Sequence, residues 1–435
     1  GTNNIAVGAN ALDANTTGNH NAGLGTQALG ANTTGTGNTG VGTFSLDANT
    51  TGGYNTGLGY GSLGANVNGL QNTAVGAFAL DANTSASYNT AVGYESLTTV
   101  TTAQNNTAVG HSSLKANTSG SENVAVGTYA LLSNTTAANN TAVGYYTLSA
   151  NQSGANNVAV GMRALNNSTA SNNTGIGRDT LFANTSGTAN TALGTFALQL
   201  NTTASNNTAV GYNALNANTT GTENVAIGAN ALDTNTTGSY NTAIGKGALD
   251  ANTSGERNTG IGNSCLDANT TGDKNTAVGM GSLGSNTTAV NNTAIGYQAL
   301  NQNTTGSDNT AVGEAALKNS TTASENTAIG RYALRNTTTG TFNTAVGRNA
   351  LIENTTGQRN VAVGYQCLNN ATANDNTAVG YQALKFNTTG SANVAIGDRA
   401  LDANTTATGN VAVGKDSLGV NTTGDGNTAL GWSSL

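Results

Sequence analysis

Residues 292–306 read NTAIGYQALNQNTTG, and close copies of this stretch follow one another along the whole chain. Each copy begins at an Asn that recurs 26 times, from Asn4 to Asn427. Successive copies are 17 residues apart at 23 of the 25 intervals and 16 residues apart at the other two. No linker or shift in composition interrupts them, so the sequence predicts one continuous repeat array over residues 1–435 rather than several globular domains.

The repeat follows the pattern N-T-A-V-G-x-x-A-L-x-x-N-T-T-G-x-x, whose repeat positions we number 1 to 17. Asn occupies position 1, Gly position 5 and Leu position 9 in every copy. Position 3 is always Ala or Gly, position 4 is always Val, Ile or Leu, and position 8 is always small. Positions 6, 7, 10, 16 and 17 vary freely and carry nearly every charge.

This pattern favours short strands and turns over helices, because Gly, Asn and Thr are poor helix formers. Alternation along a strand places positions 2 and 4 on one face, and the constant aliphatic residue at position 4 indicates that this face is the core. Leu at position 9 supplies a second inward anchor, and Gly at positions 5 and 15 marks turns. We therefore predict an all-β parallel β-solenoid of about 26 coils, with two short strands per coil and a rise of about 4.8 Å per coil.

Columns of identical residues are expected to hold the coils together. The residues expected to form these ladders include Asn4, Asn21, Asn38, Val7, Val41, Leu12, Leu29 and Leu46. Stacked Asn side chains at position 1 can hydrogen-bond from coil to coil, although Asn could also serve there only as a turn residue. Asn at position 12 fits turn chemistry better, because Val100, Ser320 and Thr337 replace it. The chain contains no Pro, which agrees with an unbroken backbone ladder.

Position 3 is expected to point away from the core, yet it never carries a polar side chain. A closely packed second layer would explain this restriction. We expect identical chains to supply that layer by self-association, as a trimer around a central axis. Association of chains end to end, as a filament, is a second form of self-association that the repeat permits. Close packing within a single chain is the alternative.

Composition excludes several classes of protein. A net charge of −7 argues against a nucleic-acid partner held by basic contacts. No apolar run approaches the length of a transmembrane helix, so no membrane insertion is expected within this segment. Two His and two Cys are too few for a metal or nucleophile cluster, so we expect no catalytic residue, cofactor or metal site and no enzyme activity. Cys265 and Cys367 both occupy position 8, six coils apart, and are expected to be small buried residues rather than a disulfide.

Three surface features suggest contacts with other molecules. Tyr recurs at position 6, where the rings could stack on glycans or a partner, or pack along the solenoid: Tyr60, Tyr94, Tyr145, Tyr212, Tyr297, Tyr365 and Tyr381. Asp recurs at position 10, where we expect solvated carboxylates, because calcium needs six to eight oxygens in one place. Paired Thr at positions 13 and 14 invite an ice-binding hypothesis, but neighbours on an extended strand point in opposite directions.

Residues 123–127, NVAVG, resemble the N-S-V-A-I-G centre of head repeats in trimeric autotransporter adhesins, which form left-handed parallel β-rolls in trimers. The full repeat at residues 292–306 is more similar to repeat arrays of bacterial and phage fibre proteins that often precede an endosialidase-type intramolecular chaperone. The resemblance covers the whole chain and implies a trimeric, adhesive surface fibre. The chain departs from the adhesin heads in its 17-residue period and its added N-T-T-G turn.

These observations together predict an extracellular structural fibre or adhesin shaft, at a cell surface or in a phage tail fibre. Such a rod, about 125 Å long, would space, assemble or adhere, with a host surface or glycan as its ligand. The alternative hypothesis is an ice- or glycan-binding β-solenoid. The absence of capping repeats favours a window of a longer fibre.

Overall fold

The computed structural model describes all residues 1–435 and divides them into two compact units, Gly1–Thr220 and Gly221–Leu435. Strands β1–β13 belong to the first unit and β14–β26 to the second, and neither unit contains a helix. A helix long and apolar enough to cross a membrane is accordingly not found.

Every strand has three residues and covers repeat positions 2–4. The strands of the first unit are β1 (Ile5–Val7), β2 (Ala22–Leu24), β3 (Thr39–Val41), β4 (Thr56–Leu58), β5 (Thr73–Val75), β6 (Thr90–Val92), β7 (Thr107–Val109), β8 (Val124–Val126), β9 (Thr141–Val143), β10 (Val158–Val160), β11 (Thr174–Ile176), β12 (Thr191–Leu193) and β13 (Thr208–Val210). Those of the second unit are β14 (Val225–Ile227), β15 (Thr242–Ile244), β16 (Thr259–Ile261), β17 (Thr276–Val278), β18 (Thr293–Ile295), β19 (Thr310–Val312), β20 (Thr327–Ile329), β21 (Thr344–Val346), β22 (Val361–Val363), β23 (Thr377–Val379), β24 (Val394–Ile396), β25 (Val411–Val413) and β26 (Thr428–Leu430).

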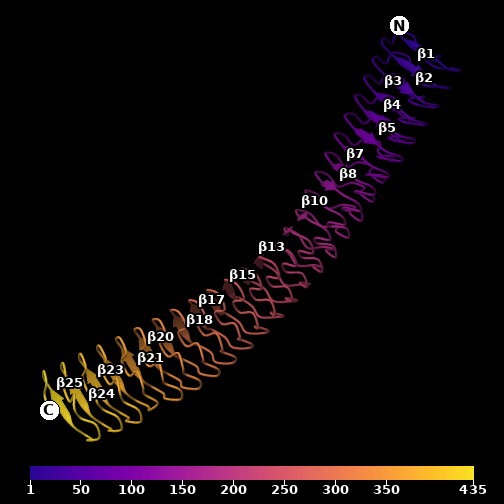
Figure 1. The fold of residues 1–435 in the computed structure, drawn as a ribbon. Helices are drawn as coiled ribbons and strands as arrows, with labels where there is room; N and C mark the ends of the chain where they lie inside the picture. The colour runs from indigo at the N-terminus through magenta and orange to yellow at the C-terminus, as the bar shows by residue number, and fades with distance from the viewer. The chain divides into compact units, whose positions relative to one another are not determined.

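Within each unit, successive strands pair in parallel and lie side by side in chain order (Figure 1). The pairing matches equivalent repeat positions, as in Ala6 with Gly23 of the next coil and Ala243 with Gly260. One repeat is therefore one coil, and the prediction of a parallel β-solenoid is confirmed for both units. The single array over residues 1–435 stays a prediction.

Each coil contains one strand, so the prediction of two strands per coil is wrong. The Leu at position 9 lies in the left-handed region, with φ of 56° at Leu46 and 50° at Leu300. A strand cannot include such a residue, because extended backbone needs a negative φ. The turn nevertheless bonds to the next coil, since Leu46 N donates to Ser62 O at 3.0 Å. Coil-to-coil hydrogen bonding thus continues through the turns.

The inward face of each strand is position 3, and the expectation that positions 2 and 4 face the core is wrong. Ala142 and Ala159 at position 3 are fully buried, whereas Val7 at position 4 is 60% exposed, and Val41 is half-buried. The coil is too narrow for a larger residue at position 3, because a methyl group on Gly40 would lie 3.4 Å from Leu29 Cγ. Packing within one chain, and not the expected contact with another chain, therefore keeps position 3 small.

The interior of each coil is filled mainly by residues at positions 1, 3, 8, 9, 12 and 15. Leu29 and Leu46 at position 9 are fully buried, and Leu12 in the first coil is 8% exposed. Each such Leu contributes about 1.5–3 kcal/mol by leaving water. Asn at positions 1 and 12 makes up most of the polar part of this interior, and Ser or Thr at position 8 adds to it in some coils.

Two coils, residues 157–172 and 360–375, are one residue shorter than the others. The missing residue falls in the turn after position 12, and the strands on either side keep their pairing, with Val158 opposite Thr174 and Val361 opposite Thr377. The turn at positions 13–15 therefore absorbs changes in coil length.

Candidate functional surfaces

The Asn at position 1 forms a hydrogen-bonded ladder inside each unit. Asn38 N donates to Asn21 Oδ1 at 2.9 Å, and Asn38 Nδ2 donates to Gly52 O at 2.8 Å. Asn21 N donates in the same way to Asn4 Oδ1. Because each buried amide meets backbone groups of its own coil and its neighbours, this Asn connects the coils and does more than shape a turn.

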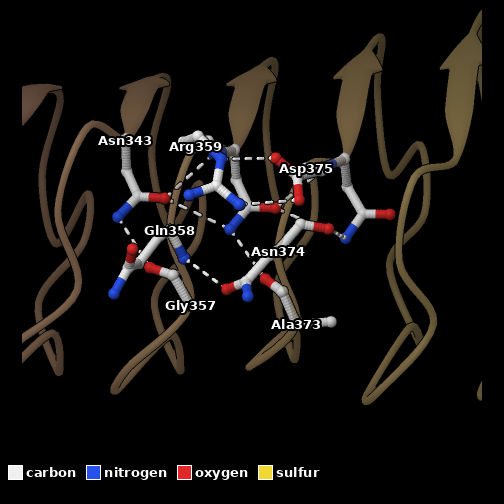
Figure 2. A network of polar contacts seen from close by, with 9 residues as sticks. Asn343, Gly357, Gln358, Arg359, Ala373, Asn374 and Asp375 are labelled. Carbon is white, nitrogen blue, oxygen red and sulfur yellow. Dashed lines mark hydrogen bonds and ion pairs between the residues drawn. The ribbon is translucent and has the colours of Figure 1, made fainter.

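Figure 2 shows this arrangement in the second unit, where Asn343 Nδ2 donates to Gly357 O at 2.8 Å. On the surface beside it, Arg359 forms two hydrogen bonds with the carboxylate of Asp375 in the next coil, at 2.6 and 2.9 Å. The Arg359 guanidinium lowers the pKa of the Asp375 carboxyl. Surface ion pairs of this kind add little stability, so the buried ladder carries the structural role.

A second Asn ladder runs along position 12, where only a turn residue was expected. Asn32 Nδ2 donates to Gly35 O at 3.1 Å, which is the expected turn bond, and also to Asn15 Oδ1 of the preceding coil at 3.0 Å. The ladder is interrupted where Ser320 replaces Asn: the Oδ1 of Asn303 and the Oγ of Ser320 are buried without partners. The sequence feature that could have predicted this second ladder is the recurrence of Asn at position 12 in most coils.

The outward face of the strands carries an aliphatic row at position 4, which we call the apolar stripe. It consists of Val, Ile and Leu side chains in successive coils, for example Ile227, Ile244 and Ile261, which are 39%, 37% and 39% exposed. Thr or Val at position 2 flanks it, and no charged residue occurs at positions 1–5 of any repeat. An uncharged apolar row repeated in every coil is the kind of surface that marks a protein contact.

The predicted Tyr residues are exposed, with Tyr60, Tyr94 and Tyr145 each about half accessible. In the first unit these three Tyr residues belong to an aromatic row that runs over seven successive coils. The other rings of the row come from residues that were not among the predicted Tyr residues at position 6. The row consists of Phe44, Tyr60, Phe78, Tyr94, His111, Tyr129, Tyr145 and Tyr146, with ring centroids 4.5–6.5 Å apart. The sequence signal for this row is an aromatic residue at position 6 or position 7 in each of these successive coils.

The other predicted Tyr residues do not join this row. Tyr212 packs edge-on against Phe196, and Tyr365 stacks on Tyr381 at 5.5 Å. Tyr297 is 46% exposed. Packing along the solenoid and exposure to solvent thus coexist at position 6, and only the first unit assembles an extended aromatic surface.

The Asp residues at position 10 include one column of three, Asp233, Asp250 and Asp267, in successive coils of the second unit. Burial raises the pKa of all three carboxyl groups, and the next carboxylate in the column raises it further for Asp233 and Asp250. No group of three or more His, Cys, Asp or Glu in the structure is placed to hold a metal ion. The column is therefore a site of like-charge repulsion.

Replacing Asp250 with Asn should stabilise the second unit at pH 7 by a few tenths of a kcal/mol to about 1 kcal/mol, since solvent screens these half-exposed charges. Because the pKa of Asp250 is raised in the folded state, its favourable contribution to the free energy of unfolding is fully present below the unfolded pKa. That contribution is lost as the pH rises through the folded pKa. The gain over the parent protein should thus shrink towards about pH 4. Thermal unfolding at both pH values measures it, with exposed Glu325→Gln as the control for loss of one charge. An equal gain at both pH values would contradict the repulsion.

The Thr hydroxyl groups at position 13 are engaged within the solenoid. Thr33 Oγ1 donates to Thr50 O of the next coil at 3.0 Å, and Thr253 Oγ1 donates to Thr270 O at the same distance. Only the Thr row at position 14 is left facing solvent. The paired Thr residues therefore do not form a two-row face of free hydroxyl groups.

Cys265 and Cys367 are fully buried free thiols, as expected for small residues at position 8. Burial raises the pKa of each thiol to about 12, so neither is a thiolate at neutral pH. Cys265 Sγ donates weakly to Gly262 O at 3.2 Å. These residues are consistent with a role in packing.

Comparison with known proteins identifies no relative: no family model and no curated protein matches the chain.

Proposed function

We propose that this chain is the structural shaft of an extracellular fibre or adhesin, at a cell surface or in a phage tail fibre, built from identical chains that associate along the apolar stripe. The single observation that supports this proposal best is the stripe itself. Ile295, Ile329 and Ile396 are each 41% exposed at position 4, although residues of this type are usually buried.

The repeat makes the stripe complementary to another copy of itself. Its side chains recur once per coil, at the strand spacing of about 4.8 Å, so a second chain in the same direction presents an identical spacing. Three such chains arranged around one axis would cover all three stripes and leave no chain unpaired, which favours the trimer over an open assembly. The charged side chains at positions 6, 7, 10, 16 and 17 would stay in solvent.

The internal ladders support a passive mechanical role. Backbone bonds, the two Asn ladders and the Leu column all connect each coil to its neighbours, as shown by Asn49, whose Nδ2 donates to Asn32 Oδ1 at 2.9 Å. Bending or stretching a unit would have to break several of these bonds at once. We propose that such a shaft holds a binding surface away from its attachment point.

The double variant Ile227→Lys and Ile261→Lys should convert the oligomer to monomers. It places two charges in the apolar stripe, two coils apart, where a second chain would have to desolvate them. Sedimentation at about 10 µM protein would measure the change, and circular dichroism would show an unchanged fold.

The matched control is Ala229→Lys with Asn263→Lys. These residues occupy position 6 in the same two coils, and Lys246 occupies position 6 in the coil between them. The control adds the same charge outside the stripe and should leave the oligomer intact. A monomeric parent protein, or a double variant that still sediments as the oligomer, would refute association along the stripe.

A further inference from the structure

The aromatic row of the first unit contains a shallow cleft of about 350 Å³. The residues that line it include three aromatic residues, Phe44, Tyr60 and Phe78, and two acidic residues, Asp47 and Asp81, with Gly64 between the acidic residues along the repeat. Tyr60 lies edge-on to both neighbours, with ring centroids 5.7 Å from Phe44 and 5.3 Å from Phe78. The cleft is thus lined by both aromatic rings and carboxylates.

The absence of a side chain at Gly64 creates the gap between the two carboxylates. Position 10 reads Asp47, Gly64 and Asp81 in three successive coils. A methyl group on Gly64 would lie 2.9 Å from Asp81 Oδ1, 3.5 Å from Asp47 Oδ1 and 3.3 Å from Gly61 O. Three acceptor oxygens therefore face the same small space.

No cation of the chain neutralises these carboxylates. Residues 1–114 contain four acidic residues and no Lys or Arg. Of these four, Glu95 pairs with Lys115 at 2.6 Å, whereas neither Asp47 nor Asp81 forms an ion pair. Burial raises the pKa of both the Asp47 and the Asp81 carboxyl groups, which agrees with their lack of a positive partner.

We propose that this cleft binds a primary alkylammonium group, such as the side chain of a Lys on a partner protein or a free amine. Three N–H donors of the ammonium match the three acceptor oxygens around Gly64. The faces of nearby aromatic rings attract the positive charge, and their apolar surface covers the alkyl chain. This inference does not depend on self-association, because residues at positions 6, 7, 10 and 11 form the cleft, whereas the apolar stripe occupies position 4.

Titration of the full chain with n-butylammonium chloride by calorimetry tests the cleft, with n-butanol as the uncharged control. We expect n-butylammonium to bind and n-butanol to bind at least tenfold more weakly. Asp81→Asn should weaken n-butylammonium about tenfold, because it removes a charged hydrogen bond, whereas Asp13→Asn, at the same repeat position outside the cleft, should not. Equal binding of n-butanol, or unchanged binding to Asp81→Asn, would overturn the proposal.

Gly64→Lys provides a second test that keeps both carboxylates and all three rings. A Lys at position 10 is compatible with the fold of this unit, since Lys115 occupies the same repeat position in another coil. The ammonium group of the introduced Lys should occupy the gap between the two carboxylates and abolish n-butylammonium binding. Gly284→Lys, the same change at the same repeat position of the second unit, should leave binding intact. Undiminished binding to folded Gly64→Lys would refute the location.

A Gly-Lys-Gly peptide with an acetylated N-terminus, whose only primary ammonium group is that of the Lys side chain, distinguishes the two sources of the ammonium group. Binding at least tenfold tighter than n-butylammonium would assign the cleft to a Lys side chain of a protein partner. Equal affinities would assign it to the ammonium group of a free amine.

Discussion

Replacing Asn140 with Asp should destabilise the first unit by about 3–5 kcal/mol at pH 7, the cost of a buried charge without a compensating partner. The Asn140 side chain is 1% exposed. Its Nδ2 donates to Gly154 O at 2.9 Å, and its Oδ1 accepts from Asn157 N at 2.9 Å. A carboxylate keeps the acceptor but turns the donor into a second acceptor, which would face the Gly154 carbonyl oxygen.

The loss caused by Asn140→Asp should be reversed in acid. A protonated carboxyl group has one O–H donor and one acceptor and can replace both bonds of the amide. Burial raises the pKa of the introduced carboxyl in the folded state above the unfolded value of about 3.9. The free energy of unfolding of Asn140→Asp should therefore be close to that of the parent protein below about pH 4, and should fall as the pH rises through the folded pKa. Urea unfolding at pH 4 and pH 7, each compared with the parent protein, measures both effects.

The adjacent residue provides the control for Asn140→Asp. Asn139 at position 17 is exposed, so Asn139→Asp adds the same charge without burying it and should change stability by less than about 0.5 kcal/mol. If Asn140→Asp were as stable as Asn139→Asp at pH 7, the ladder at position 1 would not be a principal source of stability.

The second large effect is expected for Gly59→Ala, at about 3–5 kcal/mol. Gly59 has a φ of 138°, which side chains rarely adopt. A methyl group there would lie 2.6 Å from the carbonyl carbon and oxygen of Gly76 in the next coil. Backbone cannot yield as a flexible side chain can, so these two coils would have to separate. The bond that joins them beside the clash, from Gly76 N to Leu58 O at 2.8 Å, would then be strained. Thermal and urea unfolding measure the loss.

Gly61 in the same coil is the matched control. Its φ is 61°, a region that Phe44 and Phe78 occupy at the equivalent position 7 of neighbouring coils. Gly61→Ala should therefore cost no more than about 1–2 kcal/mol, the penalty for a left-handed Ala. Equal losses at Gly59 and Gly61 would mean that the clash with Gly76 does not limit the spacing of the coils.

The period of the repeat was enough to predict the solenoid, because a Leu and an Asn in every copy can stack only if each repeat closes one coil. The face of the strand was not predictable by the same rule. Apolar residues usually point inward, but here Leu29 and its equivalents fill the interior so far that only a methyl group fits at position 3. The larger Val and Ile side chains at position 4 are left outside.

The remaining differences also have local causes. Leu at position 9 was predicted to be a second inward anchor in a coil of two strands. It is buried, but its left-handed backbone makes a turn in place of a second strand, and this turn still bonds to the next coil. Replacements at position 12, such as Val100, favoured a turn role alone for its Asn, although the Asn side chain also bonds to the neighbouring coil in most places where Asn follows Asn. The aromatic row could not be predicted from the Tyr residues at position 6, because its rings come from two repeat positions. The fold places Phe78, at position 7, between Tyr60 and Tyr94.

The two short coils at residues 157–172 and 360–375 lose one residue without changing the register of the strands that follow. A residue is lost after position 12, yet the next Asn, at residue 173 or 376, starts the following strand in the same phase as before. The turn is thus a place where length can vary without any downstream residue changing its surroundings. A peptide epitope inserted between positions 13 and 15 of a single coil should accordingly be displayed on the surface, while every strand beyond it keeps its partner.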